Sequence, residues 1–140
     1  MIVNRQRGVS VPVKPLQDFF ERVRKELHFP ESSVTVQFIS DAEMARLNRN
    51  FRHKRGPTDV LSFPANAARP RRRTSAYFGD IAISPQTARR NARRFSRTFP
   101  AELRILILHG MLHLAGFDHE TDQGEMDRLE KRLRRRLGVT

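Results

Sequence analysis

The sequence predicts one small domain that mixes helices and strands, of the α+β or α/β class, and three observations lead to this prediction. The chain has 140 residues, which supports one hydrophobic core but not two domains of ordinary size. Helix-like and strand-like segments follow one another along it. Residues 105–115 are apolar almost throughout, which is typical of a helix buried on all sides. We therefore expect residues 1–140 to form a single domain around a central buried helix.

The N-terminal half predicts two helices and two strands. Apolar side chains recur at helical spacing after Pro15, which can open a helix. Residues 34–39 are β-branched and partly alternating, as in a strand. Ser40 begins a segment with the spacing of a capping box, so a second helix is expected from there to about Asn50. Residues 60–63 predict a short strand.

The C-terminal half predicts one strand and three helices. Residues 77–83 have a strand pattern, and Ser84 is placed to cap a helix that begins with proline. Pro100 opens the apolar helix, which Gly116 is expected to end. Residues 124–137 form an amphipathic segment with acids near its start and bases near its end, which suits a helix dipole.

The composition excludes several classes of protein. The chain has no cysteine, which rules out a disulfide scaffold, a thiolate metal site and a cysteine nucleophile. No apolar run reaches the ~18–20 residues of a membrane span. The first ten residues contain no apolar segment of the secretory type. We expect a cytoplasmic protein with no membrane partner.

Positive charge is concentrated in the middle of the chain. The net charge is +12, and residues 66–104 hold 10 basic and 2 acidic residues, a net of +8. Such a field attracts polyanions, so the charge favours a nucleic-acid partner. The alternative is a set of solvated surface arginines with no binding role.

Three histidines close together predict a metal site. His109 and His113 are four residues apart, so on a helix both rings project from one face. Gly116 ends the helix and lets the chain bring His119 back as a third ligand. A lone histidine on an apolar helix is more often a core residue, but three in this pattern favour a metal ion such as zinc. The other two histidines are expected at the surface: His28 and His53.

The spacing matches the H-E-x-x-H-x-x-G-x-x-H pattern of metzincin proteases, with one departure. Gly110 stands where these proteases place the glutamate that acts as general base. A zinc peptidase therefore remains an alternative that this residue opposes. Three neutral imidazoles leave the full charge of a zinc ion in place, which suits an anionic substrate such as a phosphodiester.

Three motifs in the sequence are similar to the signatures of one known family. Residues 109–119 (HGMLHLAGFDH) are similar to the signature H-G-x-L-H-L-x-G-Y-D-H, with Phe117 in place of tyrosine. Residues 48–64 (NRNFRHKRGPTDVLSFP) resemble N-x-x-(Y/F)-R-x-K…P-T-(D/N)-V-L-S-F-P, and residues 79–84 (GDIAIS) resemble G-D-I-x-I-S. With these motifs in the family's order, the chain resembles the YbeY family of bacterial endoribonucleases and rRNA maturation factors.

The resemblance implies a metal-dependent endoribonuclease of the single-strand type. It implies an α+β fold with a mostly parallel sheet and one antiparallel strand, and one zinc ion bound by His109, His113 and His119. It further implies a role in 3′-end maturation of small-subunit (16S) rRNA and in ribosome quality control. The implied partners are rRNA, the small ribosomal subunit and ribosome-associated proteins, with no DNA.

The resemblance also implies that Arg52 takes part in the reaction. Our hypothesis is that its guanidinium neutralises charge on the phosphoryl oxygens while the metal ion polarises the phosphate or activates water. Without the resemblance, a solvated cation beside Lys54 and Arg55 would be the simpler interpretation. A row of arginines on the helix after Ser84 is a candidate substrate-binding surface: Arg89, Arg90, Arg93, Arg94 and Arg97.

Some roles stay open at the level of sequence. The general base is not identified. Asp118 and Glu120 flank His119, but an acid beside a metal ligand more often supports that ligand than acts as a base. Ser62 and Asp80 lie in matching motifs, but hydrogen bonding within a strand or turn explains them equally well. The second alternative to the nuclease is a non-catalytic RNA-binding or ribosome-assembly factor whose metal is structural.

Overall fold

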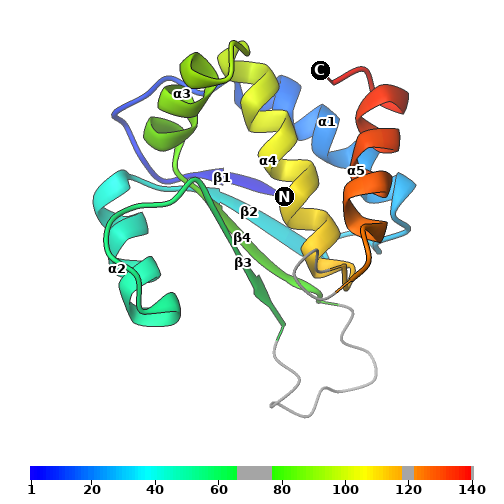
Figure 1. The fold of residues 1–140 in the computed structure, drawn as a ribbon, viewed down its shortest axis with the longest axis horizontal. Helices are drawn as coiled ribbons and strands as arrows, with labels where there is room; N and C mark the ends of the chain where they lie inside the picture. Colours follow the sequence, from blue (N-terminus) through cyan, green and yellow to red (C-terminus); the bar gives the residue numbers. More distant parts are fainter. Residues whose placement is uncertain (66–76, 118–121, 140) are drawn as a thin grey trace.

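A four-stranded sheet forms the centre of the computed structural model, which describes residues 1–65, 77–117 and 122–139 (Figure 1). The strand order is β1-β2-β4-β3. The first three of these, β1 (Ile2–Asn4), β2 (Val34–Phe38) and β4 (Gly79–Ile83), are parallel, whereas the edge strand β3 (Val60–Pro64) is antiparallel to β4. The expected α+β class, with a mostly parallel sheet and one antiparallel strand, is confirmed.

Helices connect and cover these strands, and most begin where the sequence predicts. Ser40 accepts a hydrogen bond from the Glu43 backbone N–H at 3.2 Å, and Ser84 accepts one from Thr87 at 3.3 Å, so both predicted caps are confirmed. Within the described residues the helices are α1 (Val13–Glu26), α2 (Asp41–Arg52), α3 (Pro85–Arg94), α4 (Phe99–Leu114) and α5 (Glu125–Arg136).

The structure adds one strand to those expected and corrects the placement of Arg97. Strand β1 was not predicted, because its three residues are too few to show alternation and it is held by backbone pairing with β2. Arg97 does not lie on the arginine-rich helix, because α3 ends at Arg94. The chain turns through Ser96 in the left-handed region, with φ at 54°, so Arg97 leaves the helix axis.

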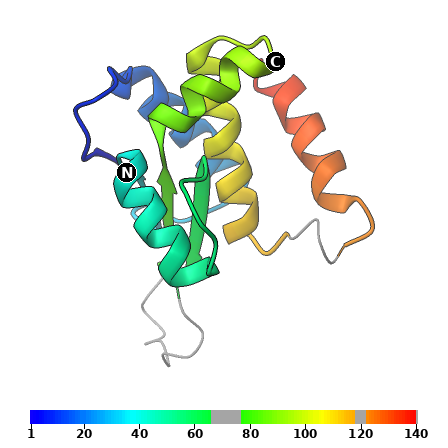
Figure 2. The same cartoon turned by 60° about the vertical axis from the view of Figure 1, so that its left-hand side comes forward.

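The helices cover the two faces of the sheet unequally. Figures 1 and 2 show α2 alone on one side, with α1, α4 and α5 on the other. The larger core lies between α1, α4, α5 and the sheet. The smaller one lies under α2 and contains Ile39, Met44, Leu61 and Ala82. No helix among the described residues is long and apolar enough to span a membrane.

Helix α4 packs unusually close to the sheet at Gly110. A Cβ atom at this position would lie 2.8 Å from Cγ2 of Ile81 on β4, closer than side-chain atoms pack in protein interiors. Ile81 is fully buried and pairs with β2 and β3 on either side, so it has no room to move away. Glycine at 110 is therefore required by the packing of helix on sheet.

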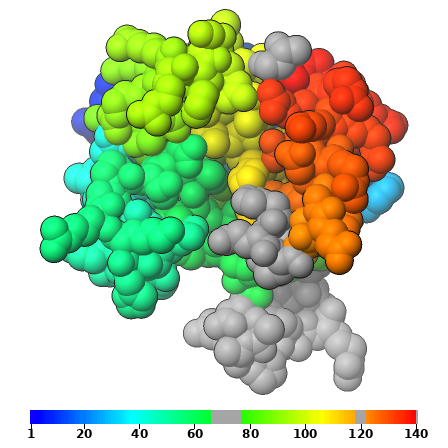
Figure 3. Space-filling model, viewed as in Figure 1, coloured from blue at the N-terminus to red at the C-terminus, as the bar shows by residue number. Residues whose placement is uncertain are grey.

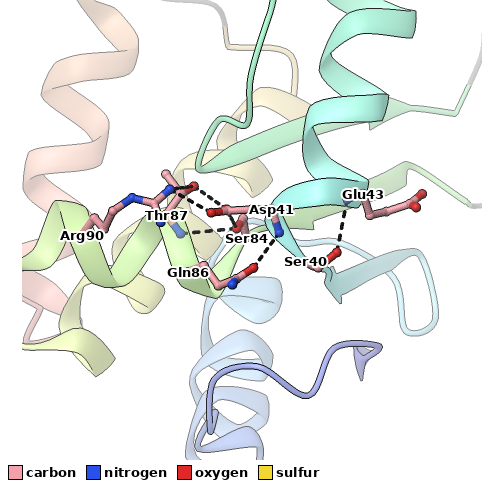
Figure 4. Close-up of polar contacts among 7 residues, drawn as sticks. All are labelled: Ser40, Asp41, Glu43, Ser84, Gln86, Thr87 and Arg90. Atoms are coloured by element: carbon pink, nitrogen blue, oxygen red, sulfur yellow. Dashed lines mark hydrogen bonds and ion pairs between the residues drawn. The ribbon is translucent and has the colours of Figure 1, made fainter.

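A polar cluster joins the N-terminal ends of α2 and α3 (Figure 4). The Asp41 carboxylate accepts hydrogen bonds from Ser84, from Thr87 at 2.7 Å and from Arg90 at 2.9 Å. The Asp41 backbone N–H donates to the Gln86 side chain at 2.7 Å. Burial raises the pKa of Asp41, but these hydrogen bonds outweigh it and hold the pKa below its ordinary value of 3.8.

Substituting Gly110 tests the close packing of α4. G110A should lower the free energy of unfolding by about 1–2 kcal/mol. The 2.8 Å contact with the immobile Ile81 places the cost in the upper part of the overpacking range, ~2–3 kcal/mol, and alanine regains ~1 kcal/mol in helix propensity. Urea unfolding measures the change. G8A is the matched control, since its Cβ would meet nothing closer than 3.6 Å. A G110A protein as stable as the wild type would contradict the packing described for this helix.

The pH dependence of stability tests the Asp41 cluster. Because the folded pKa is depressed, the stabilisation is present above the unfolded value near 3.8 and is lost as the pH falls through the folded pKa. D41N should cost about 1.5–3 kcal/mol at neutral pH, and the difference from wild type should shrink below pH ~4. Urea unfolding of both proteins, with D18N on the exposed face of α1 as control, measures this. A difference that does not vary with pH would contradict the assignment.

Candidate metal centre

A cavity of about 540 Å³ lies between α4 and the edge strand β3. Figure 3 shows a strip of α4, in yellow, at the surface between the green segments of α2 and β3 and the orange α5. Three parts of the chain line the cavity: α4 with the turn that follows it, β3 with the loop before it, and the C-terminal end of α2. The predicted residues among them are Arg52, His109 and His113.

The two histidines face each other across one turn of α4. Their Nε2 atoms are 3.2 Å apart, and the rings are inclined at 76°. Two nitrogens bound to one tetrahedral zinc ion at 2.0–2.1 Å would lie about 3.3–3.4 Å apart. The spacing of His109 and His113 therefore fits two ligands of a single metal ion. The third predicted ligand, His119, lies outside the described residues, as do Asp118, Glu120 and the arginines at 69–73.

Glu130 on α5 contacts the other side of His109. Its Oε1 atom lies 2.9 Å from Nδ1 of His109, and the two side chains are 17% and 27% exposed. This contact could not be predicted from the sequence, since Glu130 is 21 residues from His109 and lies on another helix. Only the packing of α5 against α4 brings the two groups together.

Arg52 reaches the cavity from the last residue of α2. His53 ends the helix in the left-handed conformation, with φ at 56°. The Asn48 side chain is buried and donates to the Gly56 carbonyl at 2.9 Å, which holds the loop that follows. Arg52 is thereby placed in the same cavity as both histidines, although it is exposed. His28 and His53 are also exposed, as expected.

Three further polar residues line the cavity. The sequence leaves the role of Ser62 open and assigns none to Thr58 and Asp59. Thr58 and Asp59 lie in the loop before β3, and Ser62 lies on the strand itself. Ser62 is oriented towards the Gly110 carbonyl, with its Oγ atom at 3.4 Å. Asp80 does not join them: it lines a separate cavity with α2 and accepts a hydrogen bond from Tyr77 at 2.6 Å.

The predicted arginine surface divides into two sets. Arg90 forms an ion pair with Asp41, and Arg97 forms one at 2.9 Å with Glu102, which is 2% exposed. The exposed members that remain on α3 are Arg89, Arg93 and Arg94. The helix borders the cavity, since Asn91 donates to the cavity residue Asp59 at 3.2 Å.

A side chain at position 110 would point away from the cavity and towards Ile81 on β4. A glutamate there would collide with Ile81 and could not reach a substrate beside the histidines. This is a physical obstacle to the peptidase mechanism that the histidine spacing alone suggests.

Comparison with known proteins identifies the family to which the chain is similar. A family model described as Endoribonuclease YbeY matches residues 1–138. The chain is 44% identical to Endoribonuclease YbeY of Koribacter versatilis, with 98% of this chain and 85% of the relative covered. It is 45% identical to that of Solibacter usitatus, with coverage of 89% and 78%.

A solved structure supports the same relationship. The solution structure of TM1509 from Thermotoga maritima superposes with a TM-score of 0.67 at 32% identity. The superposition covers 98% of this chain and 89% of the other. The family model spans nearly all of the sequence, and the curated relatives cover most of its length. The chain therefore belongs to the YbeY family of endoribonucleases.

Proposed function

We propose that this chain is a metal-dependent endoribonuclease whose reaction takes place in the cavity between α4 and β3. One observation carries the proposal: His109, His113 and Arg52 line the same cavity in a member of an endoribonuclease family. The expected substrate is single-stranded RNA at the 3′ end of small-subunit rRNA. A cytoplasmic location, contact with ribosome-associated proteins and a part in ribosome quality control are further parts of the proposal.

The histidine nitrogens support the proposal that the chain binds one zinc ion. Two imidazoles at the spacing of zinc ligands, with His119 as the proposed third, leave room for a substrate oxygen. When bound, the ion supplies Lewis acidity and positive charge at the phosphate.

The cationic residues of the chain itself bind and orient the RNA. The Arg52 guanidinium matches the geometry of a phosphate and neutralises negative charge that develops on its oxygens. The exposed Arg89, Arg93 and Arg94 extend the positive surface along α3 from the cavity edge. RNA carries its own nucleophile, the 2′-hydroxyl, so the absence of a glutamate at 110 is less damaging here than in a peptidase.

Substitution of Arg52 separates catalysis from folding. R52A should fold as the wild type does, because the side chain is exposed, but RNA cleavage should fall by about 10²–10³-fold. R52K should recover only part of the rate, since lysine lacks the planar fork. R49A, one turn earlier on α2 and outside the cavity lining, is the matched control. Wild-type cleavage by R52A would show that the arginine has no catalytic role.

Metal content tests the histidine site. Elemental analysis should find about one zinc per wild-type chain and little in H113A, whereas H53A should retain it. A chelator should abolish cleavage of a single-stranded RNA substrate, and casein should remain intact. Chelator-sensitive proteolysis without RNA cleavage would support the peptidase. A metal that affects only the melting temperature of the protein would support the non-catalytic factor.

A further inference from the structure

We infer that Glu130 is a positioning residue for the metal centre. Its carboxylate fixes the orientation of the His109 ring and determines which ring nitrogen of His109 carries hydrogen. The inference rests on the metal site of the proposed function and names a residue that acts through one of its ligands. It concerns a side chain on α5, a helix that otherwise contributes packing to the core.

The geometry defines which nitrogen of His109 faces the metal. A carboxylate can only accept a hydrogen bond, so the Nδ1 atom 2.9 Å from Glu130 is the nitrogen that carries hydrogen. In a neutral imidazole the other nitrogen then carries a lone pair in place of a hydrogen. That nitrogen, Nε2, is the atom 3.2 Å from Nε2 of His113. The contact therefore prepares His109 as a ligand through Nε2.

Glu130 is itself held in place. Met126 and Leu133, four residues before it and three after it, are 1% and 5% exposed and pack into the core with α4. Arg134 lies 4.0 Å from the second carboxylate oxygen. The side chain of Glu130 is only 17% exposed, whereas that of Asp127 on the same helix is 62% exposed. The carboxylate is thus fixed by its helix before any ligand arrives.

A purely structural ion pair between α4 and α5 is the alternative. Such a pair would affect the stability of the protein but not its affinity for metal. A positioning role predicts instead a loss of metal affinity, because removal of a carboxylate behind a ligating histidine typically weakens metal binding by about 10- to 100-fold.

The test measures zinc affinity of the full chain by competition with a chromophoric chelator. We expect E130A to bind zinc about 10- to 100-fold more weakly than wild type. E130Q should fall between them, since its amide oxygen can still accept a hydrogen bond from Nδ1. D127A, which removes an exposed carboxylate one turn away, should bind as wild type does. The absorption spectrum of bound cobalt(II) should change in E130A and not in D127A.

Each result decides the inference. Wild-type zinc affinity in both E130A and E130Q would overturn it while leaving the metal site intact. A wild-type protein that binds no zinc would overturn both the inference and the proposed function. If circular dichroism shows that E130A is unfolded, E130Q alone decides: weaker binding supports the positioning role, and unchanged binding refutes it.

Discussion

The close approach of α4 to β4 is the contact on which the rest of the molecule depends. It needs glycine at 110, because any side chain there would meet Ile81 in the middle of the sheet. With the helix this near the sheet, the side chains of His109 and His113 line the cavity beside the edge strand β3. Helices α1, α3 and α5 all pack against α4. The helix that carries the two histidines is therefore also the centre of the hydrophobic core.

This packing also determines the chemistry that the cavity can support. The position that carries a general base in metzincins is occupied by the contact with β4, and Arg52 approaches the histidines from α2 instead. A cavity with imidazoles and a guanidinium is suited to an anionic substrate. The hydrogen bonds of Asp41 to α3 matter here, because they fix the start of the helix whose last residue is Arg52.

Local features of the sequence predict much of the fold and of the candidate site. Contacts between residues far apart in the sequence could not be predicted from it. Ser40 and Ser84 could be identified as caps because the groups they bond lie three residues away. The histidine pair could be predicted because a helix alone brings residues four apart together. By contrast, Arg52 was identified only through a motif, and Glu130 not at all, because packing between separate helices places them. The position of Arg97 depended on a turn with positive φ at a serine, which composition does not reveal.

The most direct measurement is a titration in which zinc content and RNA cleavage are determined on the same samples. Wild-type protein stripped of metal is supplied with increasing zinc and given an RNA that spans the 3′ end of small-subunit rRNA. Cleavage should be absent without metal and should rise in proportion to bound zinc until one ion per chain is reached. Full cleavage by the metal-free protein would contradict the proposal that the facing histidines form a catalytic metal centre.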